Sequence, residues 1–201
     1  VGFICPESGN TNQTICPAGR VCAQKGSASP SSVCPAGSYC LEGTDSEIIG
    51  EGPLLCPPAT FCLMGVESNE VRDNDASSPQ TCIQGTYCEE GTTGPQASPC
   101  PPGYFCPAGV SEPIIVEKGH FAKGYGNSIQ QTCSPGTFSS TEGMSECEVC
   151  PEGYFCPYDG TVEPLICPAG TYREEDPSQI ECSLCPQGTW SDVPGLSSKT
   201  D

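Results

Sequence analysis

The apolar positions of this chain recur at a fixed distance from cysteine, without the period of a helix or of a long strand. Nine cysteines are followed three residues later by a small residue and five residues later by a bulky apolar one. These repeats open at Cys16, Cys34, Cys56, Cys82, Cys100, Cys133, Cys150, Cys167 and Cys185. We count positions from the opening cysteine, so the glycine stands at the third position and the aromatic residue at the fifth. A short fixed period predicts a linear array of small repeats, which spans a distance or presents a surface.

The repeats come in two forms. In the short form a second cysteine stands at the sixth position, as Cys22, Cys40, Cys62, Cys88, Cys106 or Cys156. In the long form the sixth position is polar (Ser139 or Arg173), and the second cysteine comes later, at Cys147 or Cys182. Alternating residues followed by turn formers predict that the long form is a β-hairpin with stapled ends. The short form is too brief for a hairpin by this reasoning, and we expect a tight turn.

Each position of the repeat suggests a physical role. Glycine at the third position indicates a positive φ or close backbone packing, although Ala59 shows that the requirement is not absolute. We expect the apolar residue at the fifth position to lie against a neighbouring disulfide, which gives each repeat a miniature core. Aliphatic pairs such as Leu54-Leu55 and Ile114-Ile115 are expected to fill gaps between repeats.

The pattern divides the chain into three parts. Residues 1–109 form an array of short repeats, and residues 133–201 hold the long repeats together with one short one. At Val116 the pattern expects a cysteine and does not find one. We therefore interpret residues 110–132, which include His120, as a linker or an insertion.

Composition narrows the fold class. The chain has 201 residues and 18 cysteines, together with 24 glycines and 22 prolines. So many turn formers and so little aliphatic material predict a small disulfide-rich fold of about ten cysteine-stapled turns and β-hairpins, with little regular secondary structure and no single hydrophobic core. Disulfides on this scale indicate an extracellular or cell-surface location.

The sequence leaves two disulfide registers open. In the first, each opening cysteine bonds to the next cysteine, which gives 16–22, 34–40, 56–62, 82–88, 100–106, 133–147, 150–156 and 167–182. The second joins residues 5–16, 22–34, 40–56, 62–82, 88–100 and 156–167, with comfortable loop lengths but an awkward closure near the CxxC pairs. In the first register Cys5 and Cys185 are left over, because both ends of the sequence look cut in mid-repeat. We expect those two cysteines to form bonds to further repeats or to other molecules.

Charge excludes one class of partner. Seven basic and 25 acidic residues give a net charge of −18, whereas binding of nucleic acid requires Lys and Arg to neutralise phosphates. The simplest interpretation of the acidity is a soluble surface that repels other copies. The more specific alternative is that the acidic residues bind calcium weakly or bind a cationic partner. Asp73-Asn74-Asp75 has two acids but lacks the glycine and the distal glutamate of an EF-hand loop, so we expect no cofactor beyond weak calcium.

Other motifs bear on chemistry and location. Asn12-Gln13-Thr14 is an N-glycosylation sequon, and we expect a glycan on Asn12. No stretch of 18 apolar residues is present, which predicts that this segment does not cross a membrane. The CxxC pairs Cys147/Cys150 and Cys182/Cys185 allow a zinc site or a redox dithiol, but they fall at repeat junctions, and structural disulfides are favoured. With one histidine and no catalytic set, we expect the protein not to be an enzyme.

The long repeats resemble the ephrin-receptor-like cysteine-rich repeat family. The resemblance rests on Cys167-Pro-Ala-Gly-Thr-Tyr172 through Cys182-Ser-Leu-Cys185, and it recurs from Cys133-Ser-Pro-Gly-Thr-Phe138 through Cys147-Glu-Val-Cys150. For residues 1–109 the short form departs from that family's longer loop. Mixed arrays of this kind resemble segments of large extracellular proteins of protists and algae, including surface coats and ciliary hairs (mastigonemes).

These observations favour three hypotheses. The first is a structural segment of an extracellular glycoprotein that acts as a rigid, protease-resistant rod in a filament, ciliary hair or surface coat, with self-association into a polymer. The second is the stalk of a cell-surface receptor or adhesion protein. The third, a secreted inhibitor or enzyme, lacks a supporting residue set.

Overall fold

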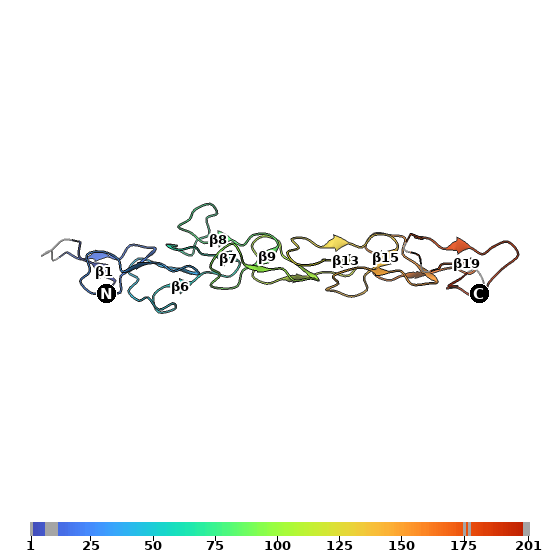
Figure 1. Cartoon of the computed structure of the whole chain (residues 1–201), viewed down its shortest axis with the longest axis horizontal. Helices are drawn as coiled ribbons and strands as arrows, with labels where there is room; N and C mark the ends of the chain where they lie inside the picture. Colours follow the sequence, from blue (N-terminus) through green and yellow to red (C-terminus); the bar gives the residue numbers. More distant parts are fainter. Residues whose placement is uncertain (1, 7–11, 175, 177, 199–201) are drawn as a thin grey trace. The chain divides into compact units, whose positions relative to one another are not determined.

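The computed structural model describes residues 2–6, 12–174, 176 and 178–198. These described residues contain no helix and form ten two-stranded antiparallel sheets (Figure 1). The pairs are β1 (Phe3–Ile4) with β2 (Thr14–Ile15), β3 (Arg20–Val21) with β4 (Ser32–Val33), β5 (Ser38–Tyr39) with β6 (Leu54–Leu55), β7 (Thr60–Phe61) with β8 (Gln80–Thr81), β9 (Thr86–Tyr87) with β10 (Ser98–Pro99), β11 (Tyr104–Phe105) with β12 (Ile114–Ile115), β13 (His120–Phe121) with β14 (Gln131–Thr132), β15 (Thr137–Phe138) with β16 (Glu148–Val149), β17 (Tyr154–Phe155) with β18 (Leu165–Ile166), and β19 (Thr171–Tyr172) with β20 (Ser183–Leu184). The expected small disulfide-rich class, with turns and hairpins in a row, is confirmed.

Every hairpin has the same construction. The fourth and fifth positions of one repeat pair with the two residues that precede the next repeat, as in Arg20↔Val33 and Val21↔Ser32. Short and long repeats both do this, so the prediction that short repeats form only a tight turn is wrong. The first strand, Arg20–Val21, lies inside the Cys16–Cys22 loop, but its partner, Ser32–Val33, lies beyond it, so the loop taken alone does not predict the pair.

Backbone hydrogen bonds connect each repeat to the next one at the third position. The opening residue of a repeat donates its N–H to the third-position carbonyl of the repeat before it, over 2.9–3.1 Å. Among the described residues this bond occurs ten times: Cys16 to Gly2, Cys34 to Gly19, Cys56 to Gly37, Cys82 to Ala59, Cys100 to Gly85, Val116 to Gly103, Cys133 to Gly119, Cys150 to Gly136, Cys167 to Gly153 and Cys185 to Gly170. The third-position N–H in turn donates to the sixth-position carbonyl of the following repeat, as from Gly19 to Cys40 over 2.8 Å.

Two more backbone bonds complete the connection between the Cys16 and Cys34 repeats. The Cys22 N–H donates to the Thr44 carbonyl over 2.9 Å, and the Gly43 N–H donates to the Cys16 carbonyl over 2.9 Å. Buried N–H and C=O groups that would otherwise lack partners are satisfied in this way without a large sheet. The ladder of backbone bonds therefore replaces the secondary structure that such short repeats cannot form alone.

The third position needs glycine for two reasons, which Gly19 illustrates. Its φ is 72°, in the left-handed region that residues with a side chain rarely adopt. A Cβ added to Gly19 would also lie 2.5 Å from the Gly65 carbonyl oxygen, which belongs to the repeat after next. Ala59 stands at the same position with φ 68°, so it accepts the strained conformation. The expectation of a positive φ together with close packing is confirmed at Gly19.

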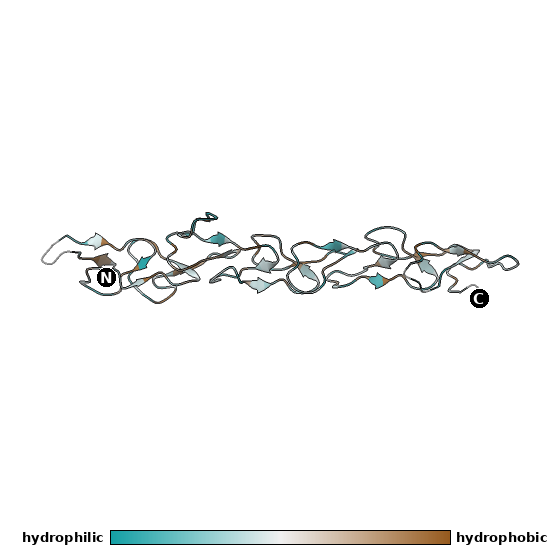
Figure 2. Cartoon of the chain, turned by 45° about the horizontal axis from the view of Figure 1, so that its top comes forward, coloured by the Kyte–Doolittle hydropathy of each residue, from teal (hydrophilic) through white to brown (hydrophobic). Residues whose placement is uncertain are grey.

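The core is divided into small clusters built on disulfides. Val21 is buried against Cys34 and Cys40, and Phe61 is buried against Cys82 and Cys88. In both cases the fifth-position side chain covers the disulfide of the next repeat, as we expected. Figure 2 accordingly shows apolar residues distributed along each region without a continuous apolar layer. Trp190, which no described repeat follows, is 80% exposed.

The aliphatic pairs fill gaps only in part. Leu54, Leu55, Ile114 and Ile115 remain 37–43% exposed. A Cβ added to Gly143 would lie 3.4 Å from Ile115 Cδ1, so this side chain lies over a glycine of the next disulfide-bonded repeat. Leu55 lies over Gly91 in the same way, with its Cδ2 3.0 Å from an added Cβ.

The chain divides into two compact regions. The first comprises Val1–Cys100 with Cys106–Pro113, and the second comprises Pro101–Phe105 with Ile114–Asp201. Within each region the repeats follow one another in chain order (Figure 1). Each hydrogen bond and each cluster described above lies within one region.

A repeat without cysteines lies where the sequence pattern predicted a linker or insertion. Val116 and Ala122 occupy the opening and sixth positions, and both are fully buried. Gly119 stands at the third position with φ 79°, and the following strand β13 pairs with β14. Two buried apolar side chains stand in place of the disulfide cysteines, and the backbone bonds of this repeat to its neighbours keep the same pattern, with Val116 donating to Gly103 and Gly119 donating to Ser139. The cysteine spacing does not reveal this repeat, because neither of its two key positions holds a cysteine.

The buried Val116 and Ala122 side chains predict an added disulfide. The short disulfides join Cα atoms 5.8–6.1 Å apart at the same two positions. We expect V116C/A122C to oxidise and to raise the free energy of unfolding of this repeat by about 2 kcal/mol, because a seven-residue loop is closed. Hydrogen exchange at the Val116 and Cys133 amides measures the gain, and the single variants V116C and A122C serve as controls. Two additional free thiols in the native double variant would contradict the prediction.

Opposite substitutions at the third position should have opposite effects. We expect Gly19→Ala to lower the local free energy of opening by about 2–3 kcal/mol, because a left-handed alanine is strained and its Cβ meets the Gly65 carbonyl. Ala59→Gly relieves the same backbone strain without that clash, and we expect it to be neutral or stabilising by up to about 1 kcal/mol. Protection of the Cys34 and Cys82 amides from hydrogen exchange reports the two changes. Equal losses in both variants would show that φ does not govern this position.

Candidate functional site

The cysteines form eight disulfides within the described part of the chain. They join Cys16–Cys22, Cys34–Cys40, Cys56–Cys62, Cys82–Cys88, Cys100–Cys106, Cys133–Cys147, Cys150–Cys156 and Cys167–Cys182. This is the register in which each opening cysteine bonds to the next cysteine. The two CxxC pairs therefore do not place four thiolates together, and no group of three metal-binding side chains occurs among the described residues.

Cys5 and Cys185 remain thiols in the structure. Both side chains are half-buried. Their backbones take part in the ladder between repeats, since the Cys5 N–H donates to Ser27 over 2.8 Å and the Cys185 N–H donates to Gly170 over 3.0 Å. The two cysteines thus occupy ordinary repeat positions without the bond that accompanies those positions elsewhere.

In the long repeats a buried polar side chain replaces the sixth-position cysteine. Arg173 is fully buried, and its guanidinium donates to the carbonyls of Cys150 over 2.8 Å, Gln179 over 2.7 Å and Asp176 over 2.9 Å. A planar guanidinium can satisfy several carbonyls at once, so it ties the long loop to the preceding repeat. Ser139 occupies the equivalent place, is also fully buried, and donates to the Thr141 carbonyl.

The sequence showed only that this position is polar. The available signal was a basic residue in a place where six other repeats have cysteine. Asp176 in the same loop accepts hydrogen bonds from the Ser178 side chain and backbone. These bonds, with a smaller contribution from the charge of Arg173, lower the pKa of Asp176.

The first long repeat, which opens at Cys133, and the Val116 repeat before it together form a groove that includes a lysine. We call it the Lys123 groove; it is lined by Phe121, Lys123, Ser134, Thr137, Glu146 and Cys147 and has a volume of about 280 Å³. Lys123 Nζ lies 2.8 Å from Glu146 Oε1. This hydrogen bond and the opposite charge of the partner lower the pKa of Glu146 and raise the pKa of Lys123. The pair lies at the surface, with about two thirds of each side chain exposed.

The second long repeat forms a larger groove with aromatic walls. We call it the Tyr158 groove; it is lined by Phe155, Pro157, Tyr158, Pro168, Thr171, Glu181 and Cys182 and has a volume of about 460 Å³. The Tyr158 side chain is 69% exposed, although its backbone carbonyl accepts a hydrogen bond from Thr161. Both grooves lie in the second compact region, each beside a long-form disulfide.

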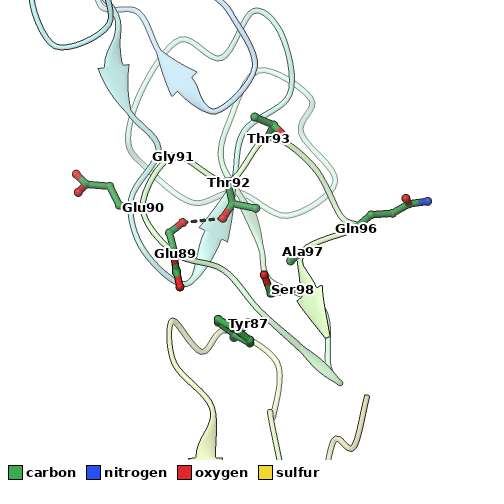
Figure 3. Close-up of a pocket in the computed structure, with 9 residues that line it drawn as sticks. All are labelled: Tyr87, Glu89, Glu90, Gly91, Thr92, Thr93, Gln96, Ala97 and Ser98. Carbon is green, nitrogen blue, oxygen red and sulfur yellow. Dashed lines mark hydrogen bonds between the residues drawn. The ribbon is translucent and has the colours of Figure 1, made fainter. Parts of the chain in front are cut away.

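A third hollow, in the Cys82 repeat, combines polar and acidic groups (Figure 3). Its volume is about 260 Å³, and Tyr87, Glu89, Thr92 and Ser98 are among its lining residues. The Thr92 hydroxyl donates to the Glu89 carbonyl over 2.7 Å and so holds the turn. The carboxylates of Glu89 and Glu90 do not face each other in Figure 3, and the hollow offers no paired acids for acid–base chemistry.

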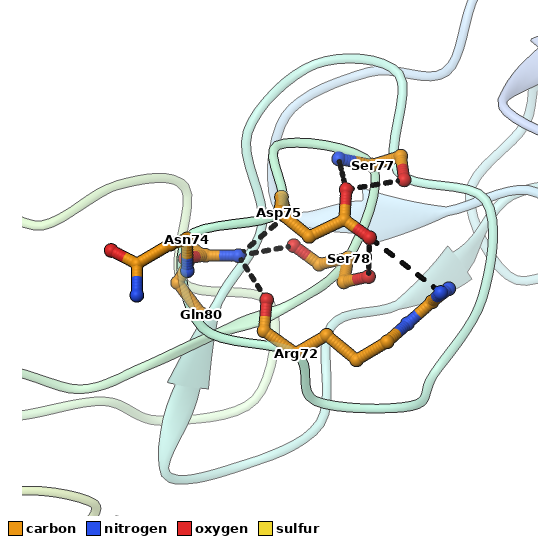
Figure 4. Close-up of polar contacts among 6 residues, drawn as sticks. All are labelled: Arg72, Asn74, Asp75, Ser77, Ser78 and Gln80. Carbon is orange, nitrogen blue, oxygen red and sulfur yellow. Dashed lines mark hydrogen bonds and ion pairs between the residues drawn. The ribbon is translucent and has the colours of Figure 1, made fainter.

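The acidic loop that suggested calcium is held by the chain's own donors (Figure 4). Asp75 accepts hydrogen bonds from the Ser77 backbone over 3.0 Å, the Ser77 hydroxyl over 2.7 Å and the Ser78 hydroxyl, and Arg72 lies 3.6 Å away. These contacts, led by the Ser77 hydroxyl, lower the pKa of Asp75. Asp73 accepts from the Thr81 backbone and hydroxyl. Calcium at this loop would have to displace these bonds.

The remaining sequence candidates lie at separate places. His120 is in β13, half-buried, with its ring Nδ1 3.1 Å from the Lys118 carbonyl oxygen. Asn12 is exposed and lies just before β2. The described residues contain no helix long and apolar enough to span a membrane.

Comparison with known proteins gives one family match. Residues 153–201 match the family described as tyrosine-protein kinase ephrin type A/B receptor-like. This stretch includes the Arg173 loop, the Cys167–Cys182 disulfide and all the lining residues of the Tyr158 groove. A search of curated proteins found no match. The disulfides and the family match together point to an extracellular or cell-surface segment of a receptor-like or structural kind.

The Lys123–Glu146 pair predicts a specific pH dependence. We expect Lys123→Ala to raise the pKa of Glu146 toward its ordinary value of 4.5, because a hydrogen bond and an attractive charge are lost. The stability contributed by the pair is present above the pKa of Glu146 and is lost as the pH falls through that lowered pKa, so wild type and variant converge in acid. At alkaline pH the stability contributed by the pair is lost as the pH rises through the raised pKa of Lys123.

Titration of the Glu146 carboxyl carbon by NMR measures the shift. Lys118→Ala removes a nearby exposed lysine that forms no ion pair with Glu146, and we expect it to leave the pKa of Glu146 unchanged. If the pKa of Glu146 rose equally in both variants, the shift would reflect the overall charge of the chain and not the pair with Lys123.

Proposed function

We propose that this chain is a structural segment of an extracellular glycoprotein, in which it acts as a rigid, protease-resistant spacer of a filament, ciliary hair or surface coat. The observation that supports this most strongly is the backbone ladder, which recurs ten times among the described residues without an enclosed core. A chain in which each repeat is held by its neighbours gains length by addition of repeats.

The disulfides support a mechanical role. A closed loop of seven residues is worth about 2 kcal/mol and one of fifteen residues about 3 kcal/mol in the chain-entropy model, so each repeat carries its own restraint against unfolding. The short-form cysteines are fully buried, which shields them from reductants. A protease that cuts one loop leaves the flanking repeats stapled, because their restraints do not depend on a shared core.

The surface suits an exposed, hydrated segment. A net charge of −18 opposes nonspecific aggregation, and a glycan at Asn12 would add to the hydration. Charge repulsion is short-ranged in physiological salt, with a screening length of about 8 Å, so it does not prevent specific association through a small surface.

The family match favours a second candidate, the stalk of a cell-surface receptor or adhesion protein. Residues 153–201 carry this similarity, and receptor-like is the word in the family's description. In that role the repeats hold a recognition domain away from the membrane and do not polymerise.

Sedimentation velocity over a range of protein concentration distinguishes the two candidates. For the filament role we expect concentration-dependent oligomers, both in the wild-type chain and in Cys5→Ser/Cys185→Ser, because packing drives association. Ladders on gels run without reductant in wild type alone would show that these two thiols add covalent links. A monomer at every concentration in both proteins would contradict the filament role and favour the stalk.

A further inference from the structure

The Lys123 groove and the Tyr158 groove are built from equivalent positions of successive repeats. Each has the fifth-position phenylalanine of one repeat, Phe121 or Phe155, and the fourth-position threonine of the next, Thr137 or Thr171. Each ends at a glutamate that directly precedes the closing cysteine of a long disulfide, Glu146 or Glu181. The same backbone ladder holds both sets of residues, so Glu146 and Glu181 are the corresponding acidic lining residues of the two grooves.

The two grooves differ in what faces the carboxylate. In the first, the seventh position is Lys123, whose ammonium lies 2.8 Å from Glu146. In the second, the seventh position is Pro157, and Glu181 has no ion pair or hydrogen bond among the described residues. The eighth position adds the exposed Tyr158 ring, and the groove is larger, about 460 Å³ against about 280 Å³.

We propose that the Tyr158 groove binds a lysine side chain presented by an extended segment of a basic partner protein. The first groove shows which group fits this frame, since there the chain supplies the ammonium itself. In the second, the ammonium would reach Glu181 while its carbon chain lies along Phe155 and Pro168. A cation near the Tyr158 ring gains further attraction from the face of the aromatic system.

Charge decides between a foreign partner and a second copy of this chain. The chain carries 25 acidic and only 7 basic residues, so a second copy offers few basic side chains to this groove, whereas a basic protein offers many and is attracted to the acidic surface. The volume of about 460 Å³ lies in the range of ligand pockets and exceeds the need of one ammonium, which leaves room for the residues next to the lysine.

A lysine peptide and an uncharged analogue test this proposal. The probe is the peptide acetyl-Gly-Gly-Lys-Gly-Gly-amide, and its control has norleucine in place of lysine, which keeps the apolar stem and removes the ammonium. Titration of the isotope-labelled whole chain is followed by NMR. We expect the lysine peptide alone to shift the Tyr158, Thr171 and Cys182 signals in a saturable way. Equal shifts with the norleucine peptide, or no shifts with either, would overturn the proposal.

Three variants assign the effect to the groove. We expect Glu181→Gln to weaken binding about tenfold by removal of the carboxylate charge. Pro157→Lys places a lysine at the position of Lys123 and should occlude the groove, with the same loss. Glu174→Gln removes an exposed acid of the same loop that does not line the groove, and its affinity should match wild type. Preserved disulfide-linked amide signals establish that each variant is folded.

Two further outcomes would contradict the proposal. Equal weakening by Glu181→Gln and Glu174→Gln would show that net charge, and not the groove, attracts the peptide. Self-association of the wild-type chain that Glu181→Gln abolishes would make a second copy the occupant. Either result leaves the proposed mechanical role standing, because that role rests on the backbone ladder.

Discussion

Close backbone contact at the third position is the constraint on which the rest of the structure depends. There the chain turns through a positive φ and exchanges hydrogen bonds with the next repeat. At Gly19 the repeat after next comes so close that its Gly65 carbonyl oxygen leaves no room for a Cβ. The Val116 repeat lacks cysteines and keeps the same bonds. The disulfides therefore stabilise an architecture that backbone hydrogen bonds define. A repeat that lacks its disulfide still keeps its place in the array.

The sixth position shows how the architecture tolerates change. Disulfide-bonded cysteines, Ala122, Ser139 and Arg173 all occupy it, and all of these are buried there. Each is accommodated in the buried position differently: the cysteines form a disulfide, Ala122 is apolar, Ser139 donates one hydrogen bond, and the guanidinium of Arg173 donates to several carbonyls. Where the closing cysteine moves away in the long form, a longer loop opens beside it. The grooves of the second compact region are a consequence of that displacement.

Much of the fold could be predicted from the sequence, because the decisive interactions are local. The disulfide-rich class, the demand for glycine at the third position and the cover of disulfides by Val21 and Phe61 all follow from a short spacing. The strand pairs of the short repeats could not be predicted, because each pairs residues on either side of a loop whose length varies from repeat to repeat. A search keyed to cysteine also passed over Val116 and Ala122.

By itself, the sequence determined the period of the repeat, the number of cysteines and the excess of acidic residues, since these depend only on which residue stands where. Only the tertiary structure decided that Val116 opens a true repeat, that the Arg173 side chain links the long loop to the preceding repeat, and that Glu181 lines an aromatic groove whose described lining residues include no Lys or Arg. The reason is physical. Each of these features is a contact between successive repeats, and its geometry is set by backbone hydrogen bonds that bring together residues distant in the chain.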